Sequence, residues 1–268
     1  MHLPRTSPVT PPESTNGVER VPPVVTPEDL LRLLVDRASE RFRPCGRFAY
    51  HFARGKLSTD PVFATLLSQP VLPGAPRLLD LGCGQGLVTA WLNAASQCHG
   101  DGHWPLGWPA PPRPLSIRGI EISGQEVRRA QCALGELAQI VCGDLRTATL
   151  GRADAIMMLD VLHYLGPGEQ KSLLERARAA LTDNGVLLLR IGDAAGGVRF
   201  AWSRWVDATI WRLRGRHRAA LSFRTLTAWM ELLRSTGFAA REIPMLGARS
   251  FANVLLLATP EPAAVVDR

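Results

Sequence analysis

Long apolar runs are missing from this sequence, and their absence bears on where the protein resides. No window approaches the roughly 18 uninterrupted apolar residues that a membrane-spanning helix needs. No apolar segment follows the first basic residue near the N-terminus, so a secretory signal is not visible. We therefore expect a soluble, cytoplasmic protein. Its 268 residues suit one α/β domain with additions, or at most two small domains.

Cysteine is scarce, and its spacing follows no pattern. The cysteines are odd in number and include no CxxC, so we expect reduced thiols rather than a disulfide framework. The five are Cys45, Cys83, Cys98, Cys132 and Cys142. Cys98 lies near His99 and His103, but no fourth ligand stands at a matching spacing. We expect that segment to be a surface loop without a metal.

Positive charge is concentrated in one part of the chain. The formal net charge is +7, and Arg199–Arg218 contains six arginines, one aspartate and three tryptophans. This basic arm, which we place at 196–221, suits an acidic carrier protein, a membrane surface or phosphate, and its composition does not choose among them. A basic amphipathic helix whose tryptophans pack in a core explains the same composition.

The N-terminal part of the chain divides into two segments. Residues 1–25 contain six prolines and few large apolar residues, which predicts a disordered tail. Order is expected from Thr26, a suitable N-cap before Pro27, with apolar residues at helical spacing as far as Phe42. We predict helical structure over 26–73.

The stretch Arg77–Gly86, RLLDLGCGQG, is the most informative in the sequence. Its leucines predict a buried strand, and Gly82, Gly84 and Gly86 then predict a tight turn before a helix over 87–95. A strand that leads into a glycine-rich turn and a helix begins a nucleotide-binding βαβ unit.

Further strands and helices alternate along the rest of the chain. The predicted strands are 117–122, 138–141, 153–159, 186–191, 239–243 and 253–258, with a surface insertion at 97–116 and a helix at 222–236. This alternation, followed by a terminal strand pair, predicts a doubly wound, mostly parallel sheet with an antiparallel edge.

Acidic side chains end several of these strands. Such a sheet binds ligands at the carboxyl ends of its strands, where Glu121, Asp144 and Asp160 fall. The turn has GxGxG spacing rather than the GxGxxG of dinucleotide enzymes, and Asp80 precedes it. An acid there suits the ammonium group of an amino-acid moiety better than a pyrophosphate. We therefore favour S-adenosylmethionine over NAD.

The motif LLDLGCGQG resembles the first motif of class I S-adenosylmethionine-dependent methyltransferases. Glu121 in RGIEIS matches the family's ribose-binding acid, Gly143-Asp144 its adenine-contacting position, and Leu159–Leu165 its motif after the fourth strand. The resemblance implies a Rossmann-like, seven-stranded sheet whose last strand is antiparallel. It also implies a set of cofactor-binding residues: Asp80, Gly82, Gly84, Gly86, Glu121, Ile122, Gly143, Asp144, Leu145 and Asp160.

The resemblance also bears on the methyl acceptor. His163, just beyond the fourth strand, is the candidate general base, or else packs over the cofactor. Arg54 or Lys56 in the cap would meet the cofactor's carboxylate, or lie on a solvated helix face. The Asn/Asp-Pro-Pro-aromatic motif of nucleobase amino-methyltransferases is absent after the fourth strand, which lowers the nucleic-acid alternative.

The sequence as a whole predicts a methyltransferase domain over 26–268, with a cap (26–73), an insertion (97–116) and the basic arm (196–221). We expect O-, N- or C-methylation of a small-molecule acceptor, carrier-bound or free, that enters under the arm. An RNA or other nucleic-acid methyltransferase is the main alternative. An NAD-dependent oxidoreductase and a non-catalytic scaffold are the others.

Overall fold

The computed structural model describes residues 25–193, 221–245 and 253–261. Apart from their last residues, the predicted tail (1–25) and basic arm (196–221) lie outside the described residues. The described chain forms a seven-stranded sheet in the order β3-β2-β1-β4-β5-β7-β6. Its strands are β1 (Arg77–Leu81), β2 (Ser116–Glu121), β3 (Gln139–Cys142), β4 (Ala153–Leu159), β5 (Leu181–Gly192), β6 (Phe238–Ile243) and β7 (Asn253–Pro260).

Strand direction confirms the predicted fold class. Strands β1 to β5 pair in parallel, whereas β7 runs antiparallel to both of its neighbours, β5 and β6. The last strand of the sequence is therefore inserted next to the β6 edge. Strand β1 pairs with β2 on one side and β4 on the other, so the strand order reverses beside β1. In open α/β sheets this reversal is where ligands bind.

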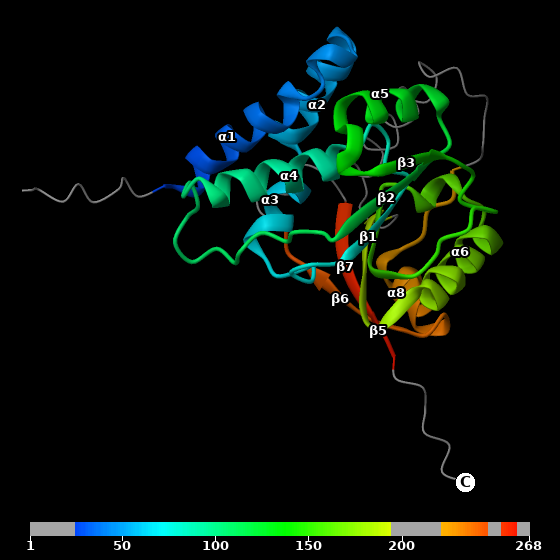
Figure 1. The fold of residues 1–268 in the computed structure, drawn as a ribbon. Helices are drawn as coiled ribbons and strands as arrows, with labels where there is room; N and C mark the ends of the chain where they lie inside the picture. Colours follow the sequence, from blue (N-terminus) through cyan, green and yellow to red (C-terminus); the bar gives the residue numbers. More distant parts are fainter. Residues whose placement is uncertain (1–24, 194–220, 246–252, 262–268) are drawn as a thin grey trace, which may run out of the picture.

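Helices cover both faces of the sheet, as Figure 1 shows. One face carries α4 (Leu87–Gly100), α5 (Gly124–Leu134) and a helical cap of α1 (Pro27–Glu40), η1 (Arg43–Cys45), α2 (Arg47–Thr59) and α3 (Pro61–Ser68). The other face carries α6 (Pro167–Ala180) and α8 (Leu226–Ser235). Trp91 and Trp229 are the largest fully buried side chains, one in each of the two cores. This arrangement is the three-layer solution for a parallel sheet.

Local sequence explains where several elements begin and end. The Thr26 hydroxyl accepts the Asp29 N–H at 3.1 Å, which confirms the predicted N-cap of α1. The predicted insertion (97–116) starts inside α4, which runs to Gly100, and ends at the first residue of β2. Strand β5 begins at Leu181, five residues before the predicted strand 186–191, because Leu181 pairs with Ala153 of β4 before the register shifts.

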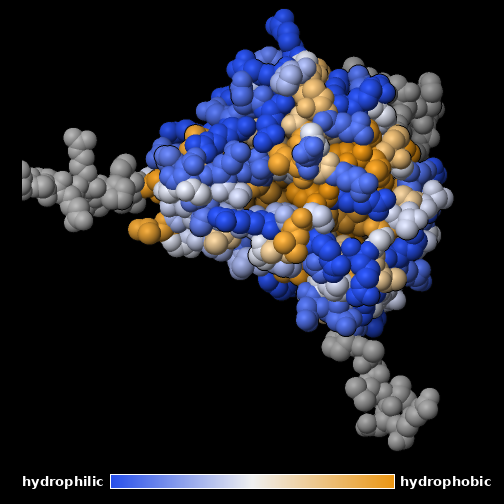
Figure 2. Space-filling model, in the orientation of Figure 1, coloured by the Kyte–Doolittle hydropathy of each residue, from blue (hydrophilic) through white to orange (hydrophobic). Residues whose placement is uncertain are grey.

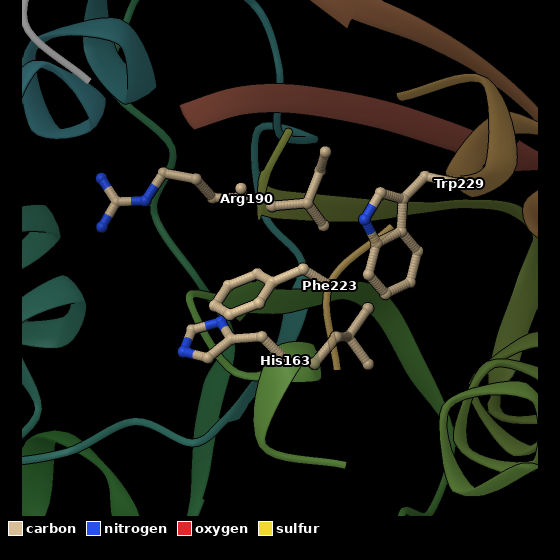
Figure 3. A pocket seen from close by; sticks show the side chains of 7 residues that line it. His163, Arg190, Phe223 and Trp229 are labelled. Atoms are coloured by element: carbon tan, nitrogen blue, oxygen red, sulfur yellow. The ribbon is translucent and has the colours of Figure 1, made fainter. Parts of the chain in front are cut away.

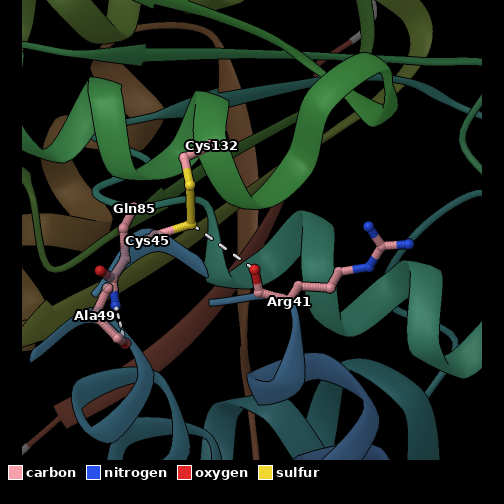
Figure 4. Close-up of a disulfide and its surroundings, with 5 residues drawn as sticks. All are labelled: Arg41, Cys45, Ala49, Gln85 and Cys132. Atoms are coloured by element: carbon pink, nitrogen blue, oxygen red, sulfur yellow. Dashed lines mark hydrogen bonds between the residues drawn. A yellow bond between two sulfur atoms is a disulfide. The ribbon is translucent and has the colours of Figure 1, made fainter. Parts of the chain in front are cut away.

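The expectation of reduced thiols is wrong for two cysteines. Cys45 of η1 and Cys132 of α5 form a disulfide with a Cα–Cα distance of 5.8 Å, shown in Figure 4. The two residues are 87 positions apart, so no local spacing reveals the pair. Cys83, Cys98 and Cys142 are free. The disulfide joins the cap to the helix that follows β2.

The described residues contain neither a membrane-spanning helix nor a cluster of metal ligands. None of the helices in this part of the chain is both long and apolar enough to cross a membrane. No group of three or more His, Cys, Asp or Glu residues within it could hold a metal ion. The face shown in Figure 2 has an apolar centre, which lies over β2 and the neighbouring edge strand β3.

Candidate functional site

The glycine turn after β1 is formed by residues that adopt left-handed backbone conformations. Gly82 has φ +74° and Gly86 φ +82°, and a Cβ on either would come within 2.5 Å of Val161 or Leu134. A Cβ on Gly84, with φ +54°, would meet nothing within 4 Å. The outer two glycines are therefore required by packing, whereas the middle one faces open space where a ligand can approach the main chain.

Asp80, next to last in β1, is a buried acid for which no described residue supplies a cation. Its side chain is only 3% exposed, and its Oδ2 has no hydrogen-bond partner among the described residues. Burial, and then the nearby Glu121 carboxylate, raise the pKa of Asp80 to about 7. An unpaired buried carboxyl group is costly. The site thus fits a ligand that brings a positive charge, such as the ammonium group of S-adenosylmethionine.

Glu121, at the end of β2, connects the turn to the next helix. Its Oε2 accepts the Gly84 N–H at 3.1 Å and its Oε1 accepts the Ser123 N–H at 2.8 Å. A carboxylate offers about four lone-pair sites, so two backbone donors leave capacity for further hydroxyl groups. The Glu121 carbonyl also accepts the Gly143 N–H at 3.0 Å, which joins the ends of β2 and β3.

The residues after β2 and β3 border the same end of the sheet. Ile122 is an exposed apolar side chain, at 45%, whereas Leu145 is buried. The Asp144 carboxylate accepts the Arg146 N–H at 2.9 Å and also pairs with the Arg146 side chain. The structure therefore brings the predicted residues of β1, β2 and β3 together at the carboxyl ends of their strands.

Asp160, after β4, has a different environment from Asp80. Its carboxylate accepts from Arg190 Nε at 2.7 Å and from Arg190 Nη2, and Lys56 lies 3.8 Å away. The third guanidinium nitrogen of Arg190, Nη1, pairs with Asp60. The pKa of Asp160 is lowered from its ordinary value, because Arg190 and Lys56 outweigh the effect of burial.

The cap residues predicted to reach the cofactor are paired with protein carboxylates. Lys56 lies 2.7 Å from Asp60, and Arg54 lies 2.5 Å from Asp36. Neither Asp60 nor Arg190 was among the site residues predicted from the sequence. A signal for Arg190 was present, since it is the one charged residue in the apolar strand 186–191.

His163 lies in η3 (Leu162–Tyr164), with a side chain only 6% exposed. Its ring stacks on Phe223, with centroids 5.3 Å apart and planes 11° from parallel, as Figure 3 shows. Burial lowers the pKa of His163 to about 4; the Asp160 carboxylate has a smaller effect that raises this pKa, and Arg190 has a smaller effect that lowers it. The imidazole is therefore neutral at physiological pH. A small pocket here is lined by Leu162, His163, Arg190, Ile191, Gly192, Phe223 and Trp229.

A family model described as a methyltransferase domain matches residues 31–243. The chain belongs to the methyltransferase family. A carboxy-S-adenosyl-L-methionine synthase from Chromohalobacter salexigens is 30% identical over 129 residues, which is 46% of this chain and 43% of that protein. The chain thus matches less than half of that relative's length.

Solved methyltransferase structures share the fold of this methyltransferase. An O-methyltransferase family protein from Burkholderia thailandensis has a TM-score of 0.56 at 16% identity, covering 88% of this chain and 67% of that one. Magnesium protoporphyrin IX methyltransferase from Synechocystis PCC 6803, with bound SAH, has a TM-score of 0.52 at 16% identity, covering 88% and 100%. The predicted family, class I S-adenosylmethionine-dependent methyltransferases, is thereby confirmed, and S-adenosylmethionine is its cofactor.

Proposed function

We propose that this methyltransferase transfers a methyl group from S-adenosylmethionine to a small-molecule acceptor. The observation that carries the cofactor site is Asp80, a buried carboxyl group with no cation among the described residues, beside an open glycine turn. Bound S-adenosylmethionine supplies an activated methyl group on a sulfonium. The chain has then only to hold cofactor and acceptor in line, so positioning accounts for most of the catalysis.

Each predicted residue has a role suited to its surroundings. Asp80 would pair with the cofactor's ammonium group, and the main chain at Gly82, Gly84 and Gly86 would border its amino-acid moiety. Glu121 would accept from the ribose hydroxyls with its remaining lone pairs. Ile122, Leu145 and Gly143 would flank the adenine, and Asp144 would accept from its amino group.

His163 supports the choice of a small acceptor. It is neutral at physiological pH and lies among aromatic side chains, so it is able to take a proton from a hydroxyl or phenol. Asp160, three residues before His163 in the chain, would border this side of the site. We place the acceptor on this side, with the cap (26–73) over the turn. The basic arm Arg199–Arg218 is a candidate landing site for an acidic carrier protein or a membrane surface.

Calorimetry with S-adenosylmethionine and S-adenosylhomocysteine tests the cofactor site. Both should bind the wild type. Asp80→Asn should weaken binding of S-adenosylhomocysteine about 30-fold, because a buried charge pair is lost. Asp183→Asn, at an exposed position of β5, is the matched control and should bind as the wild type does. Binding of NADH, together with no binding of S-adenosylmethionine or S-adenosylhomocysteine, would contradict the proposal.

The acceptor class needs a separate experiment. The enzyme is incubated with methyl-labelled S-adenosylmethionine and an extract of its own cells, which is then fractionated. Label should enter the small-molecule fraction and decline with His163→Ala. Label confined to RNA, with retention of nucleic acid that falls steeply with salt, would instead favour the nucleic-acid alternative.

A further inference from the structure

We propose that Arg190 is a positioning residue for the methyl-transfer site. Its guanidinium fastens the turn that carries Asp160 and His163 to the corner between α2 and α3. The proposal rests on the function proposed above only in taking this turn as the acceptor side of the site. Nothing in the family match or the structural relatives assigns Arg190 a role.

All three nitrogens of the Arg190 guanidinium have carboxylate partners from distant parts of the chain. Arg190 Nε and Nη2 bind the two oxygens of Asp160, and Nη1 binds Asp60. The side chains of Arg190 and Asp60 are only 3% and 7% exposed. A planar fork with fixed donors can serve both acids at once, which a lysine ammonium cannot do with the same geometry.

The charges around Arg190 balance, and this balance decides whether the guanidinium can bind an anionic ligand. Arg190 and Lys56 face Asp60 and Asp160, two cations against two anions. Although burial raises the pKa of Asp60, Arg190 and Lys56 lower it to about 2, so both acids stay ionised. Arg190 is therefore committed to the protein. Its guanidinium is already paired with two carboxylates and does not serve as a binding group for an anionic acceptor.

On the sheet side, Arg190 holds a strained turn against the glycine turn. Asp160 has φ +58° and is the one non-glycine residue with positive φ in the described chain. Such a conformation is strained for a residue with a side chain and persists where its surroundings impose it. Asp160 also donates its N–H to the Arg190 carbonyl at 3.2 Å. The next residue, Val161, occupies the space beside Gly82, and His163 follows two positions later.

On the cap side, the same guanidinium holds the end of the helix that lies beside the turn. Asp60 caps α3 by accepting the Val62 N–H at 3.1 Å, and it pairs with Lys56 in the last turn of α2. The other end of α2 is held by the Cys45–Cys132 disulfide and by Gln85 Nε2, which donates to the Ala49 carbonyl at 3.3 Å (Figure 4). Helix α2 is thus fixed at both ends, and Arg190 holds the end at which Lys56 lies 3.8 Å from Asp160.

The decisive comparison is between Arg190→Gln and Arg77→Gln. Arg77 makes the same kind of bidentate pair at the opposite end of β4. Its Nε and Nη2 donate to the two carboxylate oxygens of Asp154, each at 2.8 Å. For each variant we would measure the His163 titration by NMR, S-adenosylhomocysteine binding by calorimetry, and deuterium exchange of 56–68 and 158–165. These readouts need no knowledge of the acceptor.

Arg190→Gln should raise the pKa of His163, because the guanidinium that lowers this pKa is lost while the Asp160 carboxylate that raises it stays. Tyr164 also faces the ring, and Arg224 of the neighbouring segment is bound to Gln170, so neither replaces the lost charge. S-adenosylhomocysteine binding should weaken about tenfold, and both segments should exchange faster. Arg77→Gln should leave all three readouts unchanged.

Two results would overturn the proposal: no change in Arg190→Gln, or equal changes in both variants. If Arg190→Gln does not fold, Asp60→Asn serves instead, since it cuts only the link to the cap. Exchange should then rise in 56–68 with the His163 titration unchanged, and no rise would overturn the proposal. If the wild type does not bind S-adenosylhomocysteine, the proposed function fails, while the exchange and titration results still decide the role of Arg190.

Discussion

Asp80 and Asp160 are two acids at the carboxyl ends of neighbouring parallel strands, and they have opposite environments. Asp80 is buried, no cation in the described segments pairs with it, and its pKa is raised to about 7. Asp160 is bound by Arg190 and Lys56, and its pKa is lowered. In the part of the chain that the structure describes, one of these acids has cations as partners and the other has none. Under the proposed function, this difference separates Asp80, which would bind the cofactor, from Asp160, which would support the acceptor side of the site.

The cap is attached differently beside the two acids. Near the glycine turn after Asp80, the attachment is covalent, through Cys45–Cys132, with Arg129 over the Phe48 ring at 4.5 Å. Near Asp160 it is ionic, through Asp60 and Arg190. The following predictions test this contrast, from the largest expected effect to the smallest.

Removal of the covalent attachment should have the largest effect on stability. Cys45→Ser should lower the free energy of unfolding by about 4 kcal/mol, because the disulfide closes a loop between residues 87 positions apart. Urea unfolding without reductant measures this change. Cys142→Ser, at an exposed free cysteine, is the control and should unfold as the wild type does. Equal midpoints for the two variants would show that the disulfide does not stabilise the folded chain.

Neutralisation of the paired acid should have the next largest effect. Asp160→Asn should lower the free energy of unfolding by about 3 kcal/mol, because it leaves the buried Arg190 with one carboxylate instead of two. Asp80→Asn should leave stability unchanged or increase it, because no cation loses a partner. Equal destabilisation by both variants in chemical unfolding would remove the contrast between the two acids.

The pH dependence of stability should follow Asp80 and not Asp160. The folded state keeps a proton on Asp80 up to about pH 7, whereas the unfolded chain releases it near the ordinary carboxyl value. Stability of the ligand-free protein should therefore fall as pH rises through this window, by up to about 1.4 kcal/mol per pH unit. Asp160, with its lowered pKa, contributes stability that is lost only as pH falls below the ordinary carboxyl value.

Unfolding midpoints measured between pH 4 and 8 (about the window of Asp80 titration) would test this dependence. The decline should be present in the wild type and reduced in Asp80→Asn. The same decline in both proteins would assign the pH dependence to another group. Binding of S-adenosylhomocysteine should show the opposite trend and weaken as Asp80 is protonated, because the ammonium group then loses its counter-ion.

The smallest effect on stability is expected at the middle glycine. Gly84→Ala should cost about 1 kcal/mol, from its left-handed backbone alone, because its Cβ meets no atom. Gly82→Ala should cost more, since its Cβ would collide with Val161 beside Asp160. Calorimetry should show that Gly84→Ala nonetheless weakens cofactor binding. Unchanged binding would mean that the open space at Gly84 is not where the ligand lies.

The sequence by itself determined the parts of this protein that depend on local pattern. Alternating apolar strands and helices predicted the sheet, and RLLDLGCGQG predicted the turn, because strand period and glycine spacing are properties of adjacent residues. The acids that end β1 and β2 were predicted for the same reason, since parallel strands bring their carboxyl ends to one edge.

Only the tertiary structure decided how those parts are held. Cys45 meets Cys132 across 87 positions, and Asp60 meets Arg190 across 130. No periodicity relates such partners, because their encounter depends on how helices pack on the sheet. Both Asp80 and Asp160 were predicted from the sequence to bind the cofactor. Packing made Asp160 part of a satisfied ion pair and left Asp80 without a cation among the described residues, since only the folded chain brings Arg190 to Asp160.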